Sequence, residues 1–191
     1  MISPRRVAVV SAFVAGGVLG GAGVYLGLVT AAVPVDLGIG RRTRALGPLT
    51  VRIAAPREVV YGVIAAPYAD RTTRALREKI QVLERGTDMV LAAHNTPIRG
   101  RLHATTVETV RFARPERVDF RLVRGAVPYV AESFELDEDG DSTVLVYAGE
   151  LGTDLWGLGR LWGDLVAAKW EDTVKTSLDA VRVEAERRHH Q

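Results

Sequence analysis

An uncharged run near the amino terminus is the strongest constraint on this chain. From Val7 through Val35 there is no Asp, Glu, Lys or Arg. From Asp36 onward, charged residues occur at the ordinary density of a globular protein. A helix over this run would be about 43 Å long, whereas a bilayer core needs only about 20 residues. The run therefore predicts a single-pass anchor in the cell membrane, with residues 1–40 forming the anchor and its linker.

A cleavable signal peptide is the alternative interpretation of this run. Arg5 and Arg6 would form its basic part, and Val-Thr-Ala-Ala at 29–32 is an acceptable cleavage site. The apolar part of a signal peptide is shorter, however, at roughly 7–15 residues, so the uncleaved anchor is favoured. Because more arginines follow the run than precede it, the positive-inside rule favours the cytoplasmic side for the rest of the chain.

One stretch of the run resembles a nucleotide-binding loop: Gly-Ala-Gly-Val-Tyr-Leu-Gly at 21–27. A dinucleotide fold requires an amphipathic helix after the glycines and an acidic residue about 20 positions later. Here residues 24–30 have no polar face, and Arg-Arg-Thr-Arg occupies positions 41–44. Glycine is common in membrane helices, and glycines four residues apart also let two such helices approach closely. A homodimer contact is therefore one interpretation of Gly16, Gly20, Gly23 and Gly27.

The composition excludes several kinds of site. The chain has no Cys, which rules out disulfides, thiolate nucleophiles and Cys-ligated zinc. The net charge is only +2, and no basic helix is interleaved with aromatic residues, so nucleic acid is not an expected partner. No Gly-rich phosphate loop and no His-Glu-x-x-His sequence occurs. We therefore expect neither a cofactor nor a metal ion.

The chain after the linker predicts an α+β domain over 48–188. A strand at 49–54 precedes a helix that begins near Pro56 and a short polar helix at 70–77. Turn-forming stretches then separate six strands, which indicates an antiparallel meander; they are expected at 79–84, 88–95, 101–112, 117–123, 129–136 and 143–149. A long helix at 156–188 follows, and its apolar residues at steps of three and four predict a stripe packed on the sheet. The stripe comprises Leu158, Leu161, Trp162, Leu165, Val166, Trp170, Val174, Leu178 and Val181.

Four segments carry a resemblance to a known family: VRIAAPREVVYGVIAAPY at 51–68, VRFARPERVDFRLVRGAVPYVAESFEL at 110–136, DGDSTVLVYAGEL at 139–151, and the Trp-bearing final helix. Together they resemble the START-like superfamily, also called SRPBCC or polyketide cyclase/dehydrase and lipid transport. The resemblance implies a helix-grip fold, a curved antiparallel sheet of about seven strands wrapped on the last helix, with a mostly apolar cavity between them. It implies binding or transport of a lipid, isoprenoid or polyketide, and as the alternative a cyclase or dehydratase. Whether the chain is an enzyme stays open.

The strand at 129–136 contains the first candidate site residue. Alternation places Val130, Glu132 and Phe134 on one face, so Glu132 is a carboxylate among apolar neighbours. If that face lines a cavity, desolvation raises its pKa and makes it a candidate acid or base. The alternatives are partial solvation or an ion pair with an arginine of a neighbouring strand. Tyr147 on the last strand is a second candidate for the cavity or, equally, for the outer face.

Two histidines and the last helix supply the other candidates. His94 and His103 flank the turn at 96–100 and are expected to oppose each other across it, where they could shuttle a proton. On the last helix, Lys169 could meet an anionic head group or send its charge to water. Trp162 and Trp170 are interpreted as large apolar walls of the cavity or, equally, as plain core packing. The full ligand-binding set is Val130, Glu132, Phe134, Tyr147, Trp162, Leu165, Lys169 and Trp170.

Overall fold

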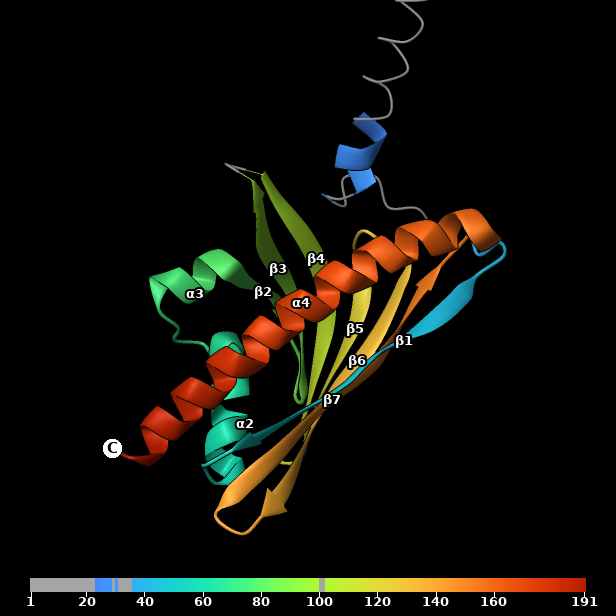
Figure 1. Ribbon diagram of the computed structural model, residues 1–191. Coiled ribbons are helices and arrows are strands. Elements are labelled where there is room, and N and C mark those ends of the chain that lie inside the picture. The colour runs from blue at the N-terminus through green and yellow to red at the C-terminus, as the bar shows by residue number, and fades with distance from the viewer. Residues whose placement is uncertain (1–22, 29, 31–35, 100–101) are drawn as a thin grey trace, which may run out of the picture.

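A computed structural model describes residues 23–28, 30, 36–99 and 102–191. Its centre is a seven-stranded antiparallel sheet with the order β1-β7-β6-β5-β4-β3-β2, crossed on one face by the long helix α4 (Figure 1). Helices α2 and α3 and a short 3-10 helix, η1, connect β1 to β2. The elements are β1 (Arg42–Ile53), α2 (Arg57–Ala65), η1 (Ala66–Tyr68), α3 (Arg74–Lys79), β2 (Ile80–Arg85), β3 (Met89–Arg99), β4 (Leu102–Ala113), β5 (Arg117–Arg124), β6 (Tyr129–Asp139), β7 (Ser142–Thr153) and α4 (Trp156–His189).

Buried and exposed side chains alternate along the strands, as expected for a sheet that is covered on one face. In β5, for example, Val118, Phe120 and Leu122 are buried, while their neighbours in sequence are exposed or half-buried. The short turns between β3 and β7 produce the expected meander, and the return of β7 beside β1 places the first strand at the sheet's edge. Helix α4 packs on β1, β7 and α2. The predicted α+β class and the order of elements are confirmed.

The first strand begins earlier than its sequence suggests. We expected it at 49–54 because Gly47 and Pro48 look like a break, but β1 extends from Arg42 to Ile53 and pairs with β7 on both sides of them. A register shift between Leu46 and Leu49 accommodates the pair as a bulge, with Gly47 at a φ of +74°. The sheet therefore includes residues before position 48.

The first half of α4 does not bury the predicted stripe. Leu158, Leu161 and Leu165 are exposed, whereas the side packed toward the sheet carries small residues at a four-residue spacing. These are Gly159, Gly163 and Ala167. The reason is the closeness of the helix to the end of β7: a Cβ atom on Gly159 would lie 1.6 Å from the backbone oxygen of Asp154. Farther along, Val174 and Leu178 are buried as expected.

Within the described residues, no helix is long and apolar enough to cross a bilayer. Most of the uncharged run at 7–35 lies outside the described residues, and so do Gly16 and Gly20 of the proposed dimer contact. Gly23 and Gly27 belong to a short helix at 23–28. The membrane anchor and the homodimer remain predictions.

Candidate functional site

A carboxyl group on the covered face of the sheet is held by donors from two other elements. Glu132 lies in the middle of β6, and its Oε2 atom accepts a hydrogen bond of 2.7 Å from the hydroxyl of Tyr147 on β7. The same Oε2 accepts a bond of 2.8 Å from the indole Nε1–H of Trp170 on α4. These two bonds place Glu132 between the sheet and the helix. Neither of them uses the second carboxylate oxygen, Oε1.

The surroundings of Glu132 shift its titration toward neutral pH. Burial raises its pKa from an ordinary value near 4.5 to about 7, and a negative charge on Glu108 acts in the same direction. The hydrogen bonds from Tyr147 and Trp170 lower the pKa, as does His94, but they do not cancel the effect of burial. Near neutral pH, Glu132 is therefore present in both its protonated and its ionised form.

A second polar cluster lies on the same face of the sheet. The Nδ1 atom of His94, on β3, is 3.1 Å from a carboxylate oxygen of Glu108 on β4, and its Nε2 atom is 3.2 Å from the hydroxyl of Tyr68. One tautomer satisfies all three groups: Nδ1–H donates to Glu108, and Nε2 accepts from Tyr68. Burial and the charges of Glu108 and Glu132 raise the pKa of Tyr68 well above its usual range. The phenol therefore stays a donor.

The two clusters face a common interior. In the strand register, Glu108 pairs with Leu122 on β5, and Glu132 pairs with Phe120 two residues away on that strand. Adjacent strands are about 4.8 Å apart, so the two carboxylates are two strands apart on one face. The apolar wall beside them is aromatic: Phe134 contacts Phe120 and Tyr147 with ring centroids 5.3 and 5.7 Å apart.

Several side chains in this interior keep accessible surface. Tyr147 is completely buried, but Glu132, Phe134 and Trp170 are only half-buried although they lie between the sheet and α4. Their packing therefore leaves water-sized space beside Glu132. Together with two ionisable clusters, this arrangement could hold a mainly apolar molecule by contact and orient one of its polar groups by hydrogen bonding.

A surface groove of about 540 Å³ lies elsewhere, along β2 and the segment 67–72. Its lining includes polar and charged side chains, among them Asp70 and Arg85, which form an ion pair of 3.1 Å. None of the residues of the two clusters lines it. Because an apolar molecule gains little by covering charged side chains, we do not regard this groove as the ligand site.

The structure brings together some of the residues that the sequence singled out. Val130 is buried and Phe134 half-buried on the same face as Glu132. Trp162 is half-buried and donates its indole N–H to the backbone oxygen of Ala126, 2.8 Å away, in the loop between β5 and β6. Trp162 therefore closes one end of the interior, whereas Trp170 contacts Glu132 directly.

Three of the predicted site residues lie elsewhere. Leu165 and Lys169 are exposed on α4 because the helix presents its other side to the sheet. His103 does not oppose His94: the register pairs His103 with Pro97 and His94 with Thr106, and His103 is exposed. The expected histidine pair is thus wrong, because His94 pairs three positions farther along β4 than we assumed. In the part of the chain that the structure describes, no three His, Asp or Glu side chains are grouped to hold a metal ion.

Sequence reasoning missed Glu108 and Tyr68, the partners of His94. For Glu108 a signal existed: it alternates with Val110 and Phe112 in a strand pattern, so that it shares their face. Nothing local distinguishes Tyr68. It follows Pro67 in the 3-10 helix after α2, and only the approach of that turn to β3 places its hydroxyl beside His94.

Comparisons with known proteins identify the fold. No protein-family model matches the sequence, and no curated protein matches it. Among solved structures, the Zhui aromatase/cyclase from Streptomyces sp. R1128 aligns with a TM-score of 0.62 and 23% identity over 78% of this chain and 95% of that chain. A norcoclaurine synthase from Thalictrum flavum aligns with a TM-score of 0.57 and 13% identity, over 77% and 96%.

A third similar structure is the di-domain ARO/CYC BexL from the BE-7585A biosynthetic pathway. It aligns with a TM-score of 0.51 and 17% identity over 80% of this chain, which corresponds to 51% of that chain. At these identities the likeness shows the fold alone. The seven-stranded antiparallel sheet and the long last helix are the helix-grip fold that the sequence resemblance implied.

Proposed function

We propose that this protein is a membrane-tethered binding protein that holds a largely apolar small molecule between its sheet and α4. The observation that carries the proposal is Glu132, a half-buried carboxyl group with a pKa of about 7 among aromatic side chains. Burying an ionisable group costs stability, so a fold selected for stability alone gains nothing from placing it there. Perturbed carboxyl groups of this kind are concentrated at functional sites.

The geometry indicates how such a ligand would be held. Tyr147 and Trp170 fix the orientation of the Glu132 carboxyl through Oε2. Its other oxygen, Oε1, can then donate to a carbonyl oxygen when protonated, or accept from a hydroxyl or amine when ionised. Burial of the apolar part of the ligand would contribute about 25 cal/mol per Å² before the costs of ordering. We therefore expect a lipid, isoprenoid or polyketide that carries one polar group.

The tether is the part of the proposal that rests on sequence. The uncharged run at 7–35 is long enough to span a bilayer, and anchoring would keep the site close to where apolar molecules partition. The arginines that follow the run favour the cytoplasmic side of the cell membrane for the domain. Protease accessibility in sealed spheroplasts tests this placement, and cleavage of the domain from outside intact spheroplasts would contradict it.

Analysis of bound small molecules tests the binding function. The full chain is purified from membranes in mild detergent, and its organic extract is compared by mass spectrometry with the extract of an unrelated membrane protein. We expect an enriched apolar compound with wild type, loss of most of it with Glu132→Gln, and full retention with Glu135→Gln. Glu135 is the matched control because it lies on the same strand, is exposed, and pairs with Arg117 at 2.6 Å. An extract without enrichment, or equal loss in both variants, would contradict the proposal.

Acid–base catalysis is the second candidate function, and the second cluster favours it. His94 and Glu108 lie close enough to Glu132 to shift its pKa, so two proton-transferring groups face one interior. They suit a cyclase or dehydratase, in which one group removes a proton from the carbon beside a carbonyl and the other protonates the hydroxyl that leaves as water. The names of the aromatase/cyclases that share this fold support the same class.

Histidine substitutions test this second function. A synthetic β-hydroxyketone ring would be incubated with the protein, and formation of the aromatic product would be followed by absorbance. His94→Gln and Glu132→Gln should each lower the rate at least tenfold, whereas His103→Gln should leave it unchanged because His103 is exposed. No turnover by the wild type, or equal rates in the two histidine variants, would count against catalysis and leave binding as the function.

A further inference from the structure

The first half of α4 presents three large apolar side chains to its surroundings. Leu158, Leu161 and Leu165 are 70%, 67% and 50% exposed. Their spacing of three and four residues puts them on one side of the helix, opposite the buried Gly159 and Gly163. We name these three side chains the leucine face. On the same side of the second half of α4, the exposed residues are mostly polar, with Val183 as the exposed apolar side chain.

The segment that enters the domain also exposes large apolar side chains. Leu37 and Ile39, just before β1, are exposed, as is Tyr25 in the short helix 23–28. The ring of Tyr25 meets that of Trp162 edge-on, with centroids 6.1 Å apart, and Figure 1 shows the short helix near the first half of α4. Large apolar side chains exposed at one end of a folded domain indicate an interaction surface when they lie together.

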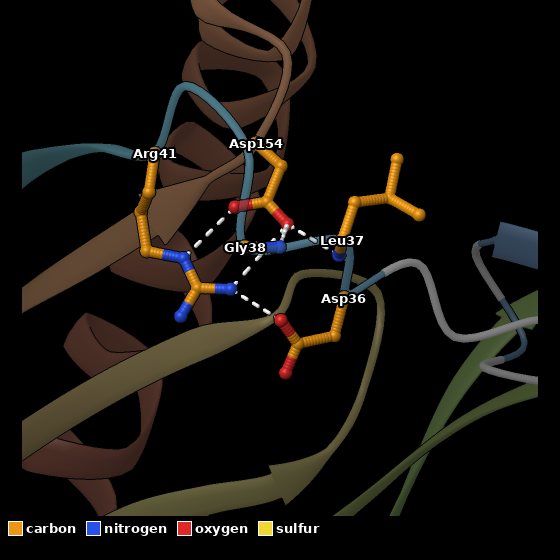
Figure 2. A network of polar contacts seen from close by, with 5 residues as sticks. All are labelled: Asp36, Leu37, Gly38, Arg41 and Asp154. Carbon is orange, nitrogen blue, oxygen red and sulfur yellow. Dashed lines mark hydrogen bonds and ion pairs between the residues drawn. The ribbon is translucent and has the colours of Figure 1, made fainter.

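A polar clamp fixes the entering segment to the start of α4 (Figure 2). Asp154, which is almost completely buried, accepts backbone bonds of 2.6 Å from Leu37 and 2.8 Å from Gly38. Its other oxygen accepts a bond of 2.8 Å from the guanidinium of Arg41, which also pairs with Asp36. The hydrogen bond from Arg41, aided by those from the two backbone N–H groups, holds the pKa of Asp154 below its usual range.

The backbone after Asp154 is shaped to continue this clamp. The N–H of Leu155 donates to the oxygen of Ile39 at 2.8 Å, and that of Trp156 donates to Gly40 at 3.1 Å. Leu155 and Trp156 both have positive φ, 67° and 48°, a conformation that costs about 1–2 kcal/mol per residue without glycine. The uncharged run ends at Val35, next to the first clamped residue. The clamp thus fixes where that run joins the domain, one turn from the leucine face.

Charges of both signs lie around the leucine face, where exposed Asp172 follows Leu165 by seven residues on the same side of α4. Arg160 and Lys169 are exposed on α4. Asp164 is the single acidic residue between 156 and 170, and it is paired with Arg44 at 3.0 Å. Lys169 lies one turn after Leu165, so the apolar strip ends at a cation, as in helices that lie in the interface of a bilayer with the apolar side among the acyl chains and the cation near anionic head groups.

We propose that the leucine face inserts into the surface of the membrane that holds the uncharged run, so that α4 lies along the bilayer. This inference rests on the tether of the proposed function and adds the orientation of the domain. The partner is a lipid surface, because the apolar run and the apolar face meet at the same clamp. The sheet then faces away from the membrane, and the ligand site lies one helix thickness from the lipid.

Spin labels can test this orientation directly, because the chain has no native Cys. The full chain is reconstituted into vesicles of phosphatidylcholine with a minority of phosphatidylglycerol, with single cysteines introduced as Leu158→Cys, Leu161→Cys and Leu165→Cys. Lys175→Cys and Asp179→Cys are the controls, since both positions are exposed on the second half of α4. Power saturation then compares collisions with oxygen and with a water-soluble nickel complex. We expect a several-fold higher oxygen-to-nickel ratio at the leucine face than at the controls.

The other results overturn the proposal in distinguishable ways. Water-exposed labels at all five positions, in protein that floats with the vesicles, would remove the leucine-face insertion and leave the tether intact. Labels shielded from both reagents, or dipolar broadening between labels at position 161, would show that protein covers the face instead. Protein that does not float with the vesicles would remove the tether and the insertion together, while the ligand analysis would still test binding.

Discussion

The two halves of α4 bury different kinds of side chain against the rest of the domain. The first half buries Gly159 and Gly163 and exposes leucines, whereas the second half buries Val174 and Leu178 and exposes mostly charged or polar residues. Where the helix runs close to the end of β7, only small residues fit beneath it; where it spans the wider interior, large residues fill the gap. The second half therefore stabilises the domain, and the first half is free to serve an interaction.

Substitution of one leucine in each half should give the largest contrast. Leu178 is 2% exposed, so Leu178→Ala should lower the free energy of unfolding by about 2–5 kcal/mol, from lost burial and a residual cavity. Leu161→Ala should change it by no more than about 0.5 kcal/mol, because its side chain is already exposed. Urea unfolding of the full chain in detergent, followed by circular dichroism, measures both. A cost of several kcal/mol for Leu161→Ala would mean that the leucine face is covered within the folded protein.

Trp170 lies between the two halves and links the helix to the titration of Glu132. Folding raises the pKa of Glu132 from near 4.5 to about 7. At pH values between these two, the folded state therefore binds a proton that the unfolded state has released. Its contribution to stability is complete below pH 4.5 and is lost as the pH rises through 7, by roughly 3 kcal/mol in total. The groups that face it are Tyr147, Trp170, Glu108, His94 and Tyr68.

Glu132→Gln should therefore remove this decline in stability between pH 5 and 8. Unfolding curves of wild type, Glu132→Gln and Glu135→Gln across that range make the comparison, and the difference between the first two isolates the titration of Glu132. Parallel pH profiles for the wild type and Glu132→Gln would show that the carboxyl group titrates normally. The case for a ligand site beside Trp170 would then lose its main support.

Sequence patterns predicted the parts of this molecule that depend on local periodicity. The strands follow from alternation, which the sheet preserves, and alternation also places Glu132 on the same face as Val130 and Phe134. Sequence patterns did not predict which side of α4 packs on the sheet. Leucines occupy one side of its first half and glycines the other, and the glycine side packs inward because the backbone of Asp154 lies too close for a larger side chain. Alternation could have placed Glu108 on the covered face, but its meeting with His94 depends on the register of β3 and β4, which differs from the one we expected. Tyr68 reaches His94 only through the approach of η1 to β3.

Gly159→Ala should break the close packing of the first half. Its Cβ would lie 1.6 Å from the backbone oxygen of Asp154, an atom that cannot move without disturbing the clamp. We expect a loss of about 1–3 kcal/mol in the free energy of unfolding, the usual cost of overpacking. The same substitution should also weaken protection of the amides of Leu37 and Gly38 from hydrogen exchange, since both donate to Asp154. Unchanged stability and protection would show that the helix can shift outward without cost.

Gly157→Ala should have the smallest effect and the opposite sign. No atom lies within 4 Å of the position that its Cβ would occupy, and the residue is exposed at the start of α4. Because alanine favours the helix over glycine, a gain of up to about 1 kcal/mol is expected. Gly157→Ala and Gly159→Ala make the same replacement two positions apart on one helix. The difference between their thermal unfolding temperatures therefore reports the closeness of Gly159 to the end of β7 rather than the helix propensity of alanine. Destabilisation by Gly157→Ala would mean that the first turn of α4 is held in a conformation that alanine resists, as at the neighbouring Leu155 and Trp156.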